Sequence, residues 1–111
     1  MNNKTCDVAN NIRYLLNVMN QKPGGFAFIT KKNKLIGLFT DGDIRRLLLE
    51  HVTIDDPISS LDIKMCKFAY DTDDYEQMMS QLNEKIRILP IVDKNMNIVN
   101  YIQHDKRSYI P

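Results

Sequence analysis

One stretch decides the fold: Gly37-Leu38-Phe39-Thr40-Asp41-Gly42-Asp43-Ile44-Arg45-Arg46. The apolar run over 35–39 predicts a buried strand, and the amphipathic pattern over 44–50 predicts a helix that follows at once. A strand that turns directly into a helix places backbone N–H groups, the Thr40 hydroxyl and carboxylates close together. Such a combination suits a phosphorylated ribose.

The spacing of Thr40 and Asp43 leaves two interpretations open. Thr40 as N-cap, with Asp43 three residues later, nearly reproduces the Ser/Thr-x-x-Glu capping box. Such a cap stabilises a helix by roughly 0.5–2 kcal/mol and needs no ligand. Both interpretations hold together if a ligand displaces the cap, so the motif alone does not decide between them.

The chain repeats itself with an offset of 63 residues, the separation of Ile12 from Tyr75. Apolar residues at i, i+3, i+4 and i+7 predict one buried helix face in each copy. The alignment has no gap and also superposes the short apolar run 26–29 on 89–92 and the run 35–39 on 98–102. Polar turns, 31–34 and 94–97, separate the two strands of each copy. The helix residues that align are Ile12, Leu15, Leu16 and Met19 with Tyr75, Met78, Met79 and Leu82.

These repeats predict an α+β fold of two β-α-β-β-α units with pseudo-twofold symmetry, packed through small sheets. One such unit is too small to bury both faces of its sheet, which favours a pair. We place the first repeat at residues 1–52 and the second at 53–111, with a further strand over 67–70. We expect the first repeat to be N-terminally short and the second to be C-terminally truncated, because by the same offset the helix of 41–50 should recur from His104 to about residue 113, past Pro111. We therefore expect a module from a longer polypeptide.

Composition restricts the function. The sequence of 111 residues carries 15 basic and 14 acidic residues, a formal charge of +1, without the basic face that nucleic-acid binding needs. It contains no apolar run of membrane-span length, its first residues lack the apolar core of a signal peptide, and its two cysteines are isolated. We expect a cytoplasmic protein without disulfides. The cysteine and histidine spacings match no zinc motif, and no catalytic motif is present, so we expect no metal and no enzyme activity in this chain.

With its 63-residue repeat and the motif that begins at Gly37, the sequence resembles a pair of cystathionine-β-synthase-type (CBS) domains, called a Bateman module. The segment 37–43 fits the family's Gly-apolar-x-Thr/Ser-x-x-Asp ligand motif, and Leu89-Pro90-Ile91-Val92-Asp93 fits a strand of a second repeat. The string 40–46 is similar to CBS pairs fused to bacterial sugar-phosphate nucleotidyltransferases or isomerases. The resemblance covers nearly the whole chain. It implies a regulatory module attached to a catalytic domain and a homodimer that forms through CBS helices.

The resemblance also implies a nucleotide site. It assigns Thr40 to phosphate and Asp43 to the ribose hydroxyls of AMP, ADP or ATP, with no obligatory cofactor. A carboxylate accepts two hydrogen bonds from a vicinal diol, and the helix N-terminus favours an anion. The full set of expected nucleotide-binding residues is Gly37, Thr40, Asp41, Asp43, Arg45 and Arg46.

The second repeat departs from this motif. Gly37, Thr40 and Asp43 align with Asn100, Gln103 and Lys106. At the position of the carboxylate that is expected to bind the ribose, the second repeat therefore has a cation. We therefore expect at most one adenosine-type site in each chain. Two other functions stay open: a ligand-free structural module that drives dimerisation, and a sensor of a pathway sugar nucleotide.

Overall fold

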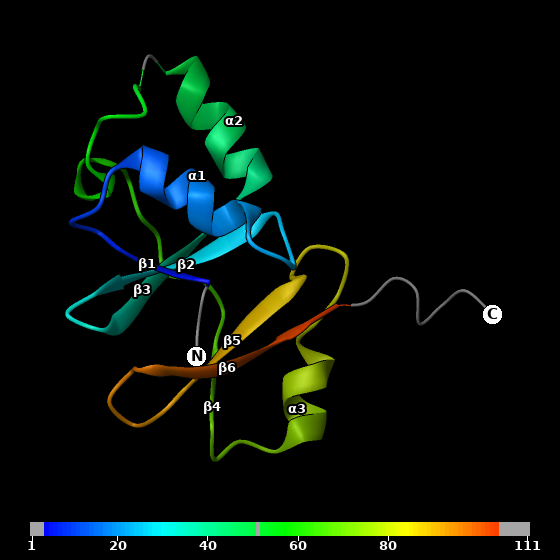
Figure 1. Cartoon of the computed structure of the whole chain (residues 1–111). Coiled ribbons are helices and arrows are strands. Elements are labelled where there is room, and N and C mark those ends of the chain that lie inside the picture. Colours follow the sequence, from blue (N-terminus) through cyan, green and yellow to red (C-terminus); the bar gives the residue numbers. More distant parts are fainter. Residues whose placement is uncertain (1–3, 51, 105–111) are drawn as a thin grey trace. The chain divides into compact units, whose positions relative to one another are not determined.

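The computed structural model describes residues 4–50 and 52–104, which divide into two compact units, Met1–Cys66 and Lys67–Pro111 (Figure 1). Each unit is α+β and contains one three-stranded mixed sheet, so the predicted fold class is confirmed. No described helix is long and apolar enough to span a membrane.

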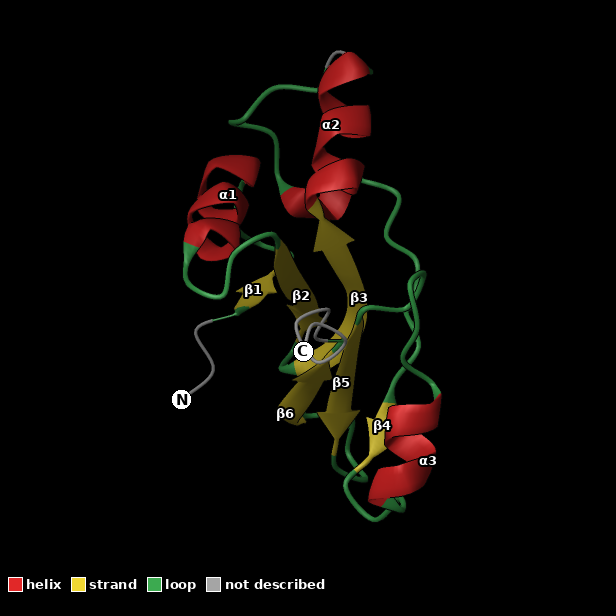
Figure 2. Ribbon diagram, turned by 90° about the vertical axis from the view of Figure 1, so that its right-hand side faces the viewer, coloured by secondary structure: helices red, strands yellow, loops and turns green. Residues whose placement is uncertain are grey.

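The first unit has the order β1 (Thr5–Asp7), α1 (Ile12–Asn20), β2 (Phe26–Lys31), β3 (Lys34–Thr40) and α2 (Asp41–Leu49). Strand β1 pairs with β2 in parallel and β2 with β3 antiparallel, which gives the sheet order β1-β2-β3. This is the predicted β-α-β-β-α unit. Figure 2 shows β3 running directly into α2, as the sequence predicts.

The core of the first unit lies where α1 and α2 cover one face of the sheet. Asn11 caps α1 through its side chain, which accepts a hydrogen bond from the Tyr14 N–H at 3.0 Å. Three of the four residues that we predicted for the buried face of α1 are buried, and Leu16 is half-buried. The buried cluster consists of Cys6, Leu15, Val18, Met19, Ala27, Ile29, Phe39, Ile44 and Ile58.

The segment that follows α2 belongs to the first unit. Ile58, in the short 3-10 helix η1 (Ile58–Ser60), is fully buried in the core of that unit. Its backbone N–H donates to the Asn10 carbonyl at 2.8 Å, and the Arg13 N–H donates to the Ile54 carbonyl at 2.8 Å. Along the sequence, the boundary of the compact units therefore falls between Cys66 and Lys67, whereas we placed the boundary of the repeats after residue 52.

The second unit repeats the pattern with β4 (Ala69–Tyr70), α3 (Tyr75–Ser80), β5 (Ile88–Val92) and β6 (Ile98–Gln103). The parallel pairing of β4 with β5 and the antiparallel pairing of β5 with β6 match the first unit. Helix α3 lies beside β4 (Figure 2), and Met78 is buried against Ala69 and the strands. The expected recurrence of α2 over 104–113, like Lys106, falls almost wholly outside the described residues.

The gapless alignment is wrong for one strand. Ala27 pairs with Phe39 in the first unit, and its counterpart Leu89 pairs with Ile102 in the second. Ile102 is 63 residues after Phe39, but Leu89 is only 62 after Ala27, so β5 is displaced by one residue. The physical reason is the two-residue period of a strand, because a slip of one residue reverses which side chains face the helices. With this displacement Leu89 and Ile91 lie in the core cluster of the second unit.

Candidate functional site

The junction between β3 and α2 holds a capping box. The Asp43 carboxylate accepts a hydrogen bond from the Thr40 backbone N–H at 2.8 Å and one from the Thr40 hydroxyl at 3.0 Å, both through Oδ2. Thr40 is the N-cap of α2, so the capping interpretation of the motif is confirmed. The carboxylate is thereby fixed at the positive end of the helix dipole.

The second carboxylate oxygen of Asp43 is also engaged. Oδ1 accepts a hydrogen bond from the Arg46 guanidinium, one helical turn further along α2. The Asp43 side chain is 27% exposed and that of Arg46 is 70% exposed. The two ends of this ion pair therefore differ: the carboxylate is held in the fold, whereas the guanidinium reaches into solvent.

A pocket of about 240 Å³ opens beside this ion pair, within the first unit. Its walls come from the end of β3, one face of α2 and the segment after η1. The lining residues are Leu38, Phe39, Asp43, Arg46, Leu47, Glu50, Asp62 and Lys64. The apolar side chains offer a surface for a flat ring, while three carboxylates and two cations surround it. A small ligand with one apolar and one polar end fits this arrangement.

Two of the six expected site residues, Asp43 and Arg46, line the pocket directly. Thr40 reaches it through its hydrogen bonds to Asp43. Asp41 is exposed and does not line the pocket; its carboxylate lies next to Gly25, where a Cβ would be 3.3 Å from Asp41 Oδ2. Arg45 is exposed and does not line the pocket.

Gly37 lies against a segment of its own chain. A Cβ at this position would lie 2.6 Å from Cγ2 of Ile63 and 2.9 Å from the Lys64 carbonyl oxygen. The absence of a side chain at Gly37 therefore admits the chain's own segment 63–64. Because Lys64 lines the pocket, Gly37 determines how closely that wall approaches β3.

The expected site residues did not include six of the eight residues that line the pocket, although two of the six, Leu38 and Phe39, lie within the quoted motif. Leu47 and Glu50 stand four and seven residues after Asp43, so the helical period would have found them. Asp62 and Lys64 come from a segment about twenty positions away, and no local pattern marks them. Lys64 and Asp62 form an exposed ion pair of 3.9 Å at the rim.

At the equivalent strand end of the second unit, Asn100 and Gln103 are both exposed. The Asn100 side-chain oxygen accepts a hydrogen bond from the Tyr101 N–H at 2.8 Å. No Thr or Asp of the kind found in the first unit stands at the end of β6 among the described residues.

Cysteines and metal-ligating residues offer no second centre within the described residues. Burial raises the pKa of the Cys6 thiol to about 11, with the nearby Asp7 carboxylate adding to the shift. Burial likewise raises the pKa of Cys66 to about 11. Both thiols are therefore poor nucleophiles at neutral pH. Residues 4–50 and 52–104 contain no group of three His, Cys, Asp or Glu side chains placed to hold a metal ion.

Neither a protein-family model nor a curated protein matches the sequence. Solved structures do match. OpuCA of Staphylococcus aureus aligns with a TM-score of 0.73 at 17% identity, over 93% of this chain and 86% of that one. A CBS domain protein of Pyrobaculum aerophilum, complexed with AMP, aligns with a TM-score of 0.69 at 20% identity, over 89% and 78%.

A CBS domain protein of Streptococcus pneumoniae aligns with a TM-score of 0.73 at 14% identity, over 96% of this chain and 71% of that one. At these identities a structural likeness establishes the fold alone. Together with the repeated β-α-β-β order, it shows that this chain has the fold of a CBS domain pair.

Proposed function

We propose that this chain is a regulatory module that binds one adenosine nucleotide in the pocket between β3 and α2. The observation that carries the proposal is Asp43, a carboxylate held by the cap of α2 and exposed along one side of a pocket. The CBS domain protein with the same fold and bound AMP supports an adenosine nucleotide as the ligand class.

The chemistry of the pocket fits such a ligand. Asp43 accepts hydrogen bonds from the two ribose hydroxyls, because an ionised carboxylate has acceptor capacity for a vicinal diol. The adenine ring packs against the apolar wall of Leu38, Phe39 and Leu47. The phosphate lies toward the N-terminus of α2, where Thr40 and the positive end of the helix dipole favour an anion.

The module acts on an attached enzyme domain, which we infer to belong to sugar-nucleotide or surface-polysaccharide metabolism. A bound ligand shifts the equilibrium between two conformations only by its difference in affinity for them. Regulation of this kind requires no catalytic group in the module itself. The resemblance of residues 40–46 to CBS pairs fused to sugar-phosphate enzymes supports this context.

Isothermal titration calorimetry with AMP, ADP, ATP, a CMP-sugar and a GDP-sugar tests the proposal. We expect one adenosine nucleotide per chain and at least a tenfold loss of affinity in Asp43→Asn, since the uncharged amide is a weaker acceptor for the diol. Thermal denaturation gives a second readout: ligand at about 100 times its Kd should add about 2.7 kcal/mol to the stability.

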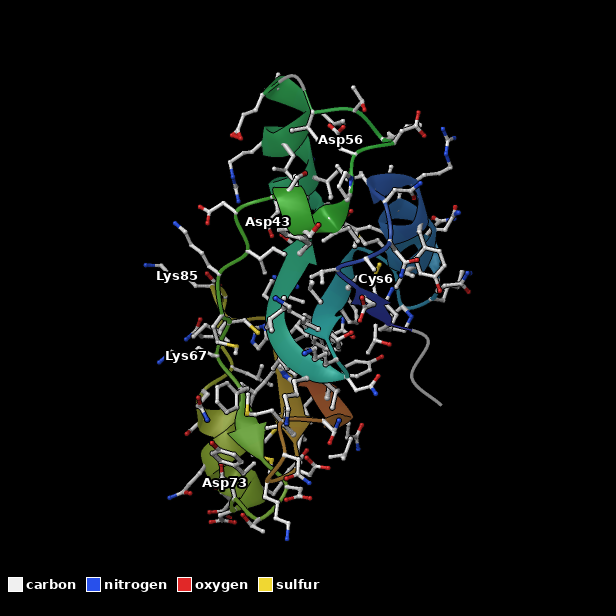
Figure 3. All side chains as sticks on the ribbon, turned by 90° about the vertical axis from the view of Figure 1, so that its left-hand side faces the viewer. Cys6, Asp43, Asp56, Lys67, Asp73 and Lys85 are labelled. Carbon is white, nitrogen blue, oxygen red and sulfur yellow. The ribbon has the colours of Figure 1, made fainter. Side chains whose placement is uncertain are left out.

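Asp56→Asn is the matched control. Asp56 accepts a hydrogen bond from the Thr53 N–H at 2.9 Å, with the same Thr-x-x-Asp spacing as Asp43, but it is not one of the residues that line the pocket. Figure 3 shows the two aspartates at separate places in the fold. Its substitution should leave nucleotide affinity unchanged. Equal losses of nucleotide affinity in both variants would mean that Asp43 acts only as a cap. Tighter binding of a sugar nucleotide than of an adenosine nucleotide would assign the pocket to a sugar nucleotide of the parent pathway.

Exposed apolar side chains favour a second candidate, a module that dimerises without a ligand. Leu48 and Leu49 at the end of α2 are 52% and 78% exposed, and Tyr75 and Met79 on α3 are 60% and 42% exposed. Sedimentation of the wild type and of Leu48→Ser/Leu49→Ser separates the two candidates. The structural function would be favoured if the wild type formed a dimer without nucleotide, the double variant were monomeric and no nucleotide bound.

A further inference from the structure

The Arg46–Asp43 ion pair occupies the atom that a ribose would need. Asp43 Oδ2 holds the N-cap of α2 through Thr40, whereas Oδ1 faces the Arg46 guanidinium. Displacing the Oδ2 bonds would open the first turn of the helix. Oδ1 is therefore the oxygen that a ligand captures first, and Arg46 is the group that it displaces.

Arg46 is free to move when this happens. Its side chain is 70% exposed, and exposed ion pairs contribute little to stability. The displaced guanidinium stays within reach of the pocket, because the position of Arg46 on α2 does not change. It then lies next to the bound ribose without its former carboxylate, and its planar donors match a phosphate.

We propose that Arg46 is a latch that makes the site select phosphorylated nucleosides over nucleosides. This inference rests on the proposed function and names the chemistry of its selectivity. A nucleoside must break the Arg46–Asp43 pair and offers the guanidinium no anionic group in exchange. A nucleotide breaks the same pair and supplies its phosphate as the new partner, so the exchange conserves the charge pairing.

One competing partner stands on the same helix. Glu50 lies four residues after Arg46, within reach of an i,i+4 ion pair, and also lines the pocket. The remaining cation of the lining, Lys64, is 3.9 Å from Asp62. If Arg46 turned to Glu50 on displacement, the phosphate would gain nothing and the selectivity would be absent.

The test is a pair of calorimetric titrations, adenosine and AMP, on the wild type and on Arg46→Gln. The measured quantity is the ratio of the adenosine Kd to the AMP Kd. Removing the guanidinium should improve adenosine binding, because Oδ1 is then open, and should weaken the phosphate contact. We expect the ratio to fall about tenfold or more, the size of one charge-assisted hydrogen bond.

Arg13→Gln is the matched control. Arg13 forms an exposed ion pair with Asp55 at 3.0 Å on α1, in the same unit but outside the pocket, so its ratio should equal that of the wild type. In Asp43→Asn, where no latch exists, adding Arg46→Gln should not improve adenosine binding. Improvement there would overturn the latch.

The outcomes separate the two proposals. AMP binding with a ratio that Arg46→Gln leaves unchanged overturns the latch while the proposed function stands. Failure of the wild type to bind AMP, ADP and ATP overturns the proposed function and the latch together. A fall in the ratio that Arg13→Gln reproduces would show a general effect of charge and would also overturn the latch.

Discussion

At the scale of single residues, two motifs of the same spacing have different surroundings. Thr40/Asp43 and Thr53/Asp56 share the same spacing and the same carboxylate–N–H hydrogen bond, at 2.8 Å and 2.9 Å. Asp43 lines the pocket and Asp56 does not, because the segment with Asp62 and Lys64 contributes the wall opposite Asp43. The difference between the two carboxylates therefore lies in their neighbours and not in their spacing from the threonine.

Gly37→Ala tests the close approach of that segment. The new Cβ would meet Ile63 at 2.6 Å and the Lys64 carbonyl at 2.9 Å, so the segment must move away. We expect a loss of about 1–3 kcal/mol in the free energy of unfolding, measured by urea denaturation, and weaker nucleotide binding. Gly24→Ala is the control, since its Cβ would lie 3.5 Å from the Met19 carbonyl oxygen, an ordinary contact. Equal stabilities of the two variants would contradict the crowding at Gly37.

At the scale of elements, a buried lysine, Lys4, binds the C-terminal end of α1. Lys4 is fully buried, and its ammonium donates to the carbonyls of Val18 at 2.9 Å, Met19 at 3.3 Å and Gln21 at 2.8 Å. It also lies 4.6 Å from the centre of the Phe26 ring. Burial lowers the pKa of Lys4, while the Asp41 carboxylate opposes the shift. A cation at the negative end of the helix dipole ties α1 to β2.

Lys4→Met measures this contact. Methionine keeps the apolar stem but removes the donors to the last carbonyls of α1, so we expect a loss of about 1–3 kcal/mol in thermal or urea denaturation. Lys67, 63 residues later, is exposed, and Lys67→Met should change stability by no more than about 0.5 kcal/mol. A Lys4→Met variant as stable as the wild type would show that the free energy lost by desolvating the buried charge equals the free energy gained from its hydrogen bonds.

The β2–β3 hairpin carries local strain. Its turn residues Lys32 and Asn33 have φ of 53° and 66°, a two-residue turn with left-handed backbone at both positions. Asparagine adopts this conformation more readily than lysine, so Lys32→Asn should raise stability by about 0.5–1 kcal/mol. Lys31→Asn removes the same charge from an ordinary strand position and should not stabilise the protein. Thermal denaturation measures the stability of both variants. A gain of stability in both would show that the effect comes from the lost charge and not from the turn.

At the scale of the whole molecule, the segment after α2 completes the first unit. Ile58 is fully buried among the side chains of α1 and the sheet, and the chain leaves the unit only at Cys66. A division of the chain at residue 52, which the repeat suggests, would remove this side chain from its own core. The same segment supplies the wall of the pocket, so core and site depend on one connection.

Ile58→Ala should therefore destabilise the first unit by about 2–4 kcal/mol, because it leaves a cavity in the core. Hydrogen exchange followed by mass spectrometry should show faster exchange in β2 than in the wild type. Met65→Ala, at a side chain that is 50% exposed, is the control and should leave the exchange in β2 unchanged. Faster exchange confined to residues 67–104 would contradict the assignment of this segment to the first unit.

The sequence by itself determined the elements of this protein, because helix and strand periods and capping spacings depend on residues close together in the chain. It predicted the two β-α-β-β units, the direct passage from β3 to α2 and the Thr40–Asp43 cap. Only the tertiary structure decided the displacement of β5 by one residue, the burial of Lys4 and the neighbours of Gly37. It also decided that Asp62 and Lys64 complete the pocket with Asp43 and Arg46. Each of these depends on contacts between segments far apart in the chain, which no local pattern encodes.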